Sequence, residues 1–179
     1  MRHSVQRFEI AAAKPPDVPE LHALIRGLAD YERLTSNCVS TEEDLDSALF
    51  GERPAAEALI ARDRENSRPA VGFALFFQTY STFVGRRGLW LEDLFVVPEQ
   101  RGAGLGRALL VELAKIAQRR GCGRFEWAVL DWNAPAIRFY ESLGATILPD
   151  WRLVRVTGRE LDRLANANAA ASLHPRRRP

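Results

Sequence analysis

The sequence predicts a single α/β domain with a mixed, mostly antiparallel sheet flanked by helices. Its 179 residues fall within the range of one domain, and 46% hydrophobic with 27% charged residues is typical of a globular protein. Helix and strand patterns alternate along most of the chain, but three strand patterns follow one another at its centre. Strands without a helix between them pair as hairpins, so we expect an antiparallel middle rather than a purely doubly wound sheet.

The first part of the chain predicts one strand and two helices. A strand over residues 5–11 ends before two prolines, and Asp17 then serves as the N-cap of a helix. Ser40, with Glu43 three residues later, has the spacing of a capping box. This box begins a second, shorter helix, which Gly51 ends.

Three strands and a long helix form the predicted centre of the domain. The strands cover residues 55–61, 71–80 and 89–97, and the second is apolar almost throughout, as expected for a strand covered on both faces. A helix follows from Leu105 to about Arg119, and its leucines lie on one stripe. Gly121, which follows this helix, is expected to end it.

The last part of the chain predicts two further strands with a short helix between them. A fifth strand covers residues 124–132, the short helix begins at Asn133, and a last strand covers residues 151–157. We therefore expect one domain over residues 1–161 and a flexible, basic tail over residues 162–179.

Composition excludes several classes of protein. The sequence has no run of about 18 uncharged apolar residues and no apolar stretch at its N-terminus, so we expect neither a membrane span nor a secretory signal, and a cytoplasmic location. Two cysteines and three histidines are too few for a disulfide framework or a metal site. Removing the arginines at 176–178 changes the net charge from +2 to −1, so we expect no nucleic-acid or membrane partner.

The most informative segment is a glycine-rich turn between a strand and a helix. Gly102, Gly104 and Gly106 stand at alternate positions, where backbone N–H groups converge on a helix N-terminus and can bind phosphate. A turn that only needs a positive φ would require one glycine. The segment is neither a P-loop, which ends in Lys-Ser/Thr, nor a dinucleotide fingerprint, which needs a small residue where Arg107 or Leu109 stands.

The spacing Arg-x-x-Gly-x-Gly, met at Arg101, Gly104 and Gly106, resembles the coenzyme A signature of the GNAT superfamily of N-acetyltransferases. The blocks LEDLFV before the turn and AVLDWN after it are similar to the spermidine/spermine acetyltransferase family, especially its thialysine (S-aminoethyl-cysteine) branch. The resemblance covers about residues 5–160. It implies a sheet that opens between its fourth and fifth strands, acetyl-CoA as cosubstrate, no metal, and a homodimer.

The resemblance also implies a coenzyme site. Backbone groups of Leu94, Phe95 and Val96 would bind the pantetheine arm, with the Val96 N–H as an oxyanion donor. Asn133 would lie beside that arm, although its place before Ala-Pro explains it equally well as a helix N-cap. The other residues implied for acetyl-CoA are Arg101, Gly102, Ala103, Gly104, Leu105, Gly106, Arg107, Ala136 and Tyr140.

Two residues are candidates for moving protons during acetyl transfer to an amine. The resemblance gives Tyr140 the role of acid toward the leaving thiolate, although its helical spacing also fits a core position. Glu92 interrupts an apolar strand, where burial would raise its pKa and let it accept the amine proton through a water. The alternative is an outward charge on a half-exposed strand. By simple alternation, Glu92 and Asp93 face opposite sides, one toward the substrate and one in a structural bond.

The amine end of the substrate is the least defined part of the site. Acids and aromatic rings suit a cationic chain, and the resemblance implies Tyr31, Glu32, Glu92, Glu126, Trp127, Asp150 and Trp151. Polyamine enzymes place an acid where Ser81 stands and further acids beyond Glu32, and this chain lacks them. We therefore expect a short amine with one or two charges, such as thialysine, a lysine-like molecule or a diamine. The alternatives are a peptide or protein amine, and a coenzyme A-binding module without chemistry.

Overall fold

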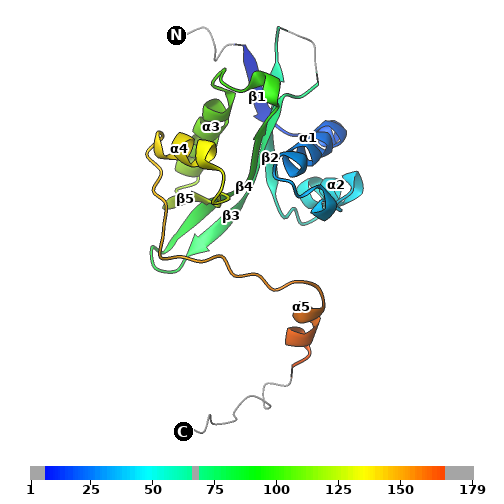
Figure 1. Cartoon of the computed structure of the whole chain (residues 1–179), viewed down its shortest axis with the longest axis vertical. Coiled ribbons are helices and arrows are strands. Elements are labelled where there is room, and N and C mark those ends of the chain that lie inside the picture. The colour runs from blue at the N-terminus through cyan, green and yellow to red at the C-terminus, as the bar shows by residue number, and fades with distance from the viewer. Residues whose placement is uncertain (1–6, 66–68, 168–179) are drawn as a thin grey trace. The chain divides into compact units, whose positions relative to one another are not determined.

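The computed structural model describes residues 7–65 and 69–167, and the chain divides into two compact units between Ala128 and Val129. In the first unit, five strands form one sheet in sequence order (Figure 1), antiparallel except for the parallel pair of the last two. The predicted mixed, mostly antiparallel sheet is therefore confirmed. Its strands are β1 (Phe8–Ala12), β2 (Glu57–Asp63), β3 (Gly72–Ser81), β4 (Arg86–Val96) and β5 (Arg124–Trp127).

Helices cover both faces of this sheet. α1 (Val18–Tyr31) and α2 (Glu42–Phe50) lie on one face, and α3 (Leu105–Arg119) lies on the other (Figure 1). The predicted leucine stripe of α3 is buried, as its spacing requires. Short 3-10 turns precede or follow these helices: η1 (Pro15–Asp17), η2 (Thr35–Asn37) and η3 (Pro98–Gln100).

The core beneath α1 and α2 fixes the position of β4. Leu21 of α1 packs in one cluster with Phe73 of β3 and Phe95 of β4, and all three are at least nine-tenths buried. Gly27 allows this approach, because a Cβ there would come within 3.2 Å of the Phe95 ring. The C-terminal half of β4 is therefore packed firmly against α1.

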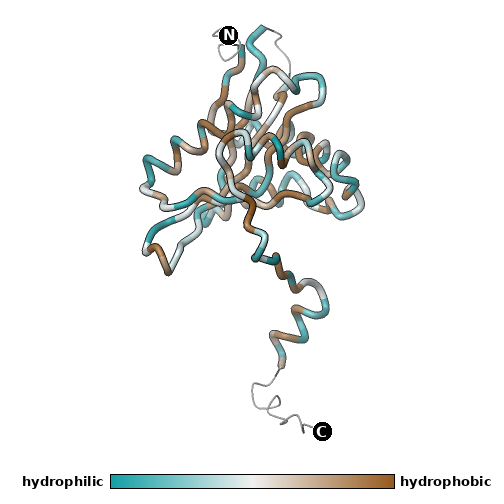
Figure 2. Tube along the Cα trace, turned by 60° about the vertical axis from the view of Figure 1, so that its left-hand side comes forward, coloured by the Kyte–Doolittle hydropathy of each residue, from teal (hydrophilic) through white to brown (hydrophobic). Residues whose placement is uncertain are grey.

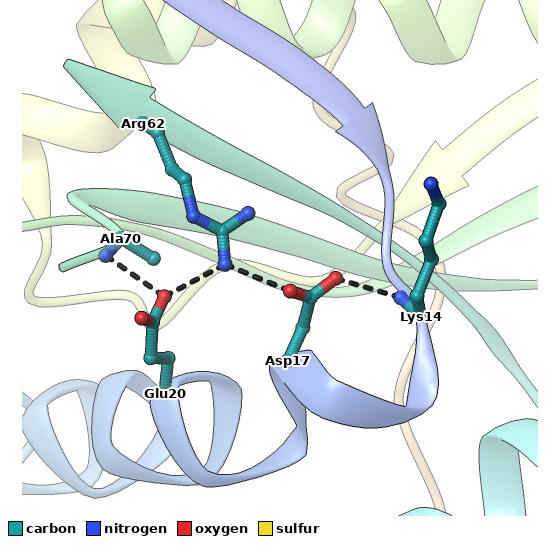
Figure 3. A network of polar contacts seen from close by, with 5 residues as sticks. All are labelled: Lys14, Asp17, Glu20, Arg62 and Ala70. Carbon is teal, nitrogen blue, oxygen red and sulfur yellow. Dashed lines mark hydrogen bonds and ion pairs between the residues drawn. The ribbon is translucent and has the colours of Figure 1, made fainter. Parts of the chain in front are cut away.

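An ion-pair network around Arg62 of β2 holds the start of α1 (Figure 3). Its Nη2 donates to Asp17 Oδ1 and to Glu20 Oε2, each at 2.8 Å. The other Asp17 oxygen accepts from the Lys14 N–H at 2.7 Å, and Glu20 Oε2 accepts from the Ala70 N–H at 3.1 Å. Asp17 is the N-cap, as predicted, but its side chain bonds to these groups rather than to the first turn of the helix.

The capping box of α2 lies one residue later than predicted. Thr41 Oγ1 accepts from the Asp44 N–H, and Asp44 Oδ2 accepts from the Thr41 N–H. The predicted pair, Ser40 and Glu43, has the same spacing, but the Ser40 carbonyl instead bonds to the His22 ring at 2.8 Å. The pairs Ser40/Glu43 and Thr41/Asp44 have the same spacing, so spacing alone does not decide which of them forms the box. The bond between Ser40 and His22 of α1 involves residues distant in the sequence.

Residues 129–167, the described part of the second unit, contain two helices, α4 (Ala134–Glu141) and α5 (Gly158–Ala165). Asn133 is the N-cap of α4, as predicted, and its side chain accepts from the Ala136 N–H. The predicted last strand over residues 151–157 does not form. Figure 2 shows alternating hydrophobic and hydrophilic residues along the segment that leads into α5, but no described strand pairs with that segment, and a strand needs a pairing partner.

Three further predictions can be compared with the structure: the start of the tail, the end of the fifth strand and the absence of a membrane span. α5 includes residues 162–165, the first four residues of the predicted flexible tail, and residues 168–179 lie outside the described part. The predicted fifth strand ends at Trp127 instead of residue 132. Within the described residues, none of the helices combines the length and the apolar character needed to cross a membrane.

Candidate active site

The glycine turn between β4 and α3 has the backbone that its sequence predicts. Gly102 and Gly104 have φ values of +79° and +86°, and Gly104 is the N-cap of α3. No side chain caps this helix, so the N–H groups of its first turn are available to an external acceptor. Gly106 lies inside the first turn, where its φ is not positive. The turn can therefore bind an anion at a helix N-terminus.

One edge of β4 is open next to this turn. β5 pairs only with residues 88–91 of β4, and no described strand pairs with residues 92–96 on that side. The Val97 N–H donates to the Val71 carbonyl at 3.0 Å, toward β3. Because successive backbone groups of a strand alternate in direction, the N–H groups of Val96 and Leu94 point to the open side. This edge can pair with an extended ligand, as expected for a sheet that opens between its fourth and fifth strands.

A β-bulge at Glu92 overturns the alternation that the sequence predicts. Leu75 of β3 lies opposite Asp93, whereas the next residue, Phe76, lies opposite Leu91, so Glu92 is the extra residue. Asp93 therefore shares a face with Leu75, toward α1, and not with Leu91, which simple alternation would give. Glu92 is exposed and accepts from Trp90 Nε1 at 2.9 Å, so the predicted burial of Glu92 is wrong.

Asp93 is the more buried of the two acids of the strand, with a half-buried side chain, and other acids lie near it. Burial, with the negative charges of Glu92 and Glu32, raises the pKa of Asp93 to about 6. Partial burial also raises the pKa of Glu32, which follows the last residue of α1. These three residues, Glu32, Glu92 and Asp93, are called the acid group below. Repulsion within the acid group means that a cation placed among them would be bound favourably.

The sequence pattern predicts Glu92 as the buried acid and places Asp93 on the opposite side of the strand, with one of the two facing the substrate and the other in a structural bond. The bulge turns Asp93 toward α1, and a bulge has no signature in the sequence of one strand. The signal that was present is the pair of adjacent acids in an apolar strand, because a buried carboxylate is costly unless it is used or paired. Within residues 7–65 and 69–167, no group of three or more His, Cys, Asp or Glu side chains is arranged to hold a metal ion.

The side chain of Arg101 is exposed but folds back from the turn toward α1. Its Nε donates to the Val96 carbonyl at 3.0 Å, and its guanidinium carbon lies 4.4 Å from the centre of the Tyr31 ring. The Phe95 ring is 5.7 Å away. Arg101 and Tyr31 line an open groove of about 660 Å³ together with apolar residues of α1 and of the segment after β4.

Two predicted substrate residues of β5 already contact other side chains of the same strand. Glu126 forms a 2.6 Å ion pair with Arg124, and the Trp127 ring lies 4.9 Å from the Phe125 ring. The charge of Glu126 is thus balanced within its own strand, unlike the charges of the acid group. Glu126 is therefore the weaker candidate for binding a cationic substrate.

The remaining predicted residues belong to the second unit. Tyr140 lies in the last turn of α4, where its ring is 5.4 Å from that of Phe139 and its carbonyl accepts from the Ala145 N–H. Ala136 donates its N–H to Asn133 in the first turn. Asp150 and Trp151 are exposed and lie in the segment between α4 and α5.

Known proteins resemble this chain over most of its length. Residues 24–145 match the model of the Acetyltransferase (GNAT) family. A thialysine N-epsilon-acetyltransferase of Sus scrofa is 38% identical over 164 residues, which cover 87% of this chain and 96% of that protein. An L-ornithine N5-acetyltransferase of Arabidopsis thaliana is 35% identical over 201 residues, covering 89% and 88%. The solved structure of an integron cassette protein from the mobile metagenome of V. cholerae has a TM-score of 0.75 at 26% identity, covering 90% of this chain and 99% of that one. With its glycine turn and opened sheet, the chain belongs to the GNAT family and is an acetyltransferase.

Proposed function

We propose that this acetyltransferase transfers the acetyl group of acetyl-CoA to the primary amine of a small substrate with one or two positive charges. Thialysine, a lysine-like molecule and a small diamine are the preferred acceptors. The observation that carries the proposal is the acid group at the C-terminal half of β4, in the same unit as the glycine turn. Two relatives named for the acetylation of thialysine and ornithine support an amino acid with a side-chain amine.

The first unit has the features that binding of acetyl-CoA requires. The φ values of Gly102 and Gly104 and the uncapped start of α3 fit a diphosphate, and the open edge of β4 fits the amides of a pantetheine arm. Bound acetyl-CoA supplies an activated thioester. In this arrangement the Val96 N–H stabilises the negative charge that develops on the thioester oxygen.

Replacing Gly104 by alanine is expected to raise the KM for acetyl-CoA about tenfold. A residue with a Cβ is strained at φ +86°, so the turn would shift by the small distance that misplaces its N–H groups. Gly121→Ala is the matched control, because Gly121 has φ +66°, follows the other end of α3 and has equally open surroundings. Both variants should lose similar stability in a thermal melt. An equal loss of acetyl-CoA affinity in the two would contradict the assignment of the turn.

The acid group and Tyr140 would divide the two proton transfers. A free alkyl amine has a pKa of about 10.4 and arrives as an ammonium ion, which the carboxylates attract. Asp93 is ionised at pH 7.5 because its pKa is about 6, so we assign to it the removal of the ammonium proton, which then leaves through water beside the exposed Glu92. We assign the donation of a proton to the departing thiolate to Tyr140, on the basis of the family resemblance.

Large apolar side chains in the second unit support a homodimer. Eight of them, all after α4, are at least 43% exposed, and burying such residues against a second copy would remove them from water. Light scattering should give a mass twice that of the 20.1 kDa chain. The double variant Leu153→Glu, Val154→Glu should give the mass of a single chain. The eight residues are Ile147, Leu148, Trp151, Leu153, Val154, Val156, Leu161 and Leu164.

The direct test of the proposed function is the release of free thiol from acetyl-CoA in the presence of different amines. Thialysine, ornithine, lysine and small diamines should raise thiol release well above background, and peptides should not. Faster release with peptide amines would favour the alternative acceptor. Binding of coenzyme A without thiol release for any amine would instead indicate a binding module.

A further inference from the structure

The side chain of Arg101 connects two parts of the proposed site that lie on different elements. It belongs to the glycine turn after β4, yet its contacts are with the Val96 carbonyl and with the rings of Tyr31 and Phe95. Turning this side chain toward a diphosphate would break all of these contacts. The glycine turn already has uncapped N–H groups for an anion, so phosphate binding does not require this arginine.

Tyr31 is the last residue of α1, and the next residue, Glu32, belongs to the acid group. After Glu32 the chain leaves the helix through Arg33, a non-glycine residue with φ +61°. A residue in this conformation needs support from its surroundings. The position of the Glu32 carboxylate therefore depends on how firmly the end of α1 is held, and the guanidinium over Tyr31 is one of the contacts that hold it.

We propose that Arg101 is a positioning residue that holds Tyr31 and thereby keeps Glu32 beside Asp93, so that the coenzyme turn and the amine site are coupled. The inference rests on the proposed function, because that function assigns the acid group to the amine. Arginine suits this role, since its planar guanidinium can stack on a ring while Nε donates to a carbonyl. Lysine cannot make both contacts in the same geometry.

The test is a double-mutant cycle with Arg101→Lys and Tyr31→Leu, measured as the KM for the amine. Each single variant should raise this KM about three- to fivefold, because an exposed cation–π contact has that order of strength. The double variant should be no worse than either single one. Arg26→Lys is the control, since it makes the same change at an exposed arginine of α1 to which no site role is assigned, and it should remain within twofold of the wild type. The dissociation constant of acetyl-CoA should change less than twofold throughout.

A second readout does not depend on turnover. NMR of the Asp93 carboxyl carbon during a pH titration of labelled protein gives the pKa of Asp93. This pKa depends on how near the Glu32 charge lies. Tyr31→Leu changes no charge, yet it should lower the apparent pKa of Asp93, because a displaced Glu32 repels that carboxylate less. Arg26→Lys should leave the titration unchanged. Because exposure of Asp93 would also lower this pKa, Glu32→Gln is titrated alongside, and in that background Tyr31→Leu should cause no further lowering.

Two results would overturn the inference. Additive effects in the cycle, or an unchanged Asp93 titration in Tyr31→Leu, would show that the contact does not position Glu32. Weaker acetyl-CoA binding in Arg101→Lys with an unchanged amine KM would make Arg101 a phosphate ligand instead. If the wild type acetylates no amine, the proposed function fails, and the titration still decides whether Arg101 and Tyr31 hold Glu32.

Discussion

Replacing Asp93 by asparagine is expected to lower kcat/KM for the amine on the order of 10- to 100-fold at pH 7.5. The variant keeps the size of the side chain but removes the most buried charge of the acid group. The loss of one close charge from a partly buried cationic site has this order of effect. The loss should appear mainly as a higher KM for the amine, with the KM for acetyl-CoA little changed, in assays of thiol release.

The same substitution should make the protein more stable. Folded Asp93 holds its proton up to a pH of about 6, whereas the unfolded residue loses it near 3.8. The folded state therefore binds more protons in this window, and the contribution of Asp93 to stability falls as the pH rises from about 4 to 6. Above that window the ionised group costs up to about 3 kcal/mol, which an uncharged asparagine avoids. A thermal melt at pH 7.5 should show a higher midpoint.

The pH dependence of the wild type follows from the same ionisation. As the pH falls through about 6, Asp93 becomes protonated, and kcat/KM for the amine should decrease. Asp93→Asn should not show this decrease, because it has no proton to gain. Glu92→Gln is the matched control, since it removes an adjacent but exposed charge, and the relief of its repulsion on Asp93 should raise the melting midpoint by less than Asp93→Asn does. A less stable Asp93→Asn variant with normal amine kinetics would contradict both assignments.

Local sequence patterns predicted those parts of the fold that depend on neighbours along the chain. α3 begins at Leu105 and ends at Arg119, as its leucine stripe and flanking glycines indicate. Asn133 caps α4, and Gly102 and Gly104 adopt positive φ, because in each case the conformation is set by the residue itself and its nearest neighbours. The backbone of the glycine turn, where we propose that the coenzyme binds, is therefore readable from the sequence.

The amine end is not readable in this way, because contacts between distant residues determine it. The bulge at Glu92 arises from the register between β3 and β4, and it decides which acid of the strand is exposed and which is half-buried. The contact between Arg101 and Tyr31 joins residues 70 positions apart. The strand predicted at 151–157 fails for a related reason, since its apolar alternation does not specify a partner strand.

Replacing Tyr140 by phenylalanine is expected to lower kcat on the order of 100-fold or more, with both KM values changed less than threefold. The substitution removes only the phenolic O–H, and its aromatic ring can still pack beside Phe139. An acid that acts in the transition state contributes to kcat and not to ground-state binding, so the two KM values should be nearly unaffected. Initial rates of thiol release at saturating acetyl-CoA and amine measure this effect.

The expected size of the loss in kcat depends on the pKa of the leaving thiol relative to that of the Tyr140 phenol. A thiol has a pKa of about 8.5 and a phenol one of about 10, so complete proton transfer between them is slightly uphill. We therefore expect Tyr140 to help by a hydrogen bond that strengthens as charge develops on sulfur, which places the effect toward the lower end of the range for general acids. Phe139→Leu is the control, because it removes the neighbouring ring but keeps the phenol, and its kcat should stay within threefold. A Tyr140→Phe enzyme with more than a third of the normal kcat would mean that water or another group protonates the thiolate.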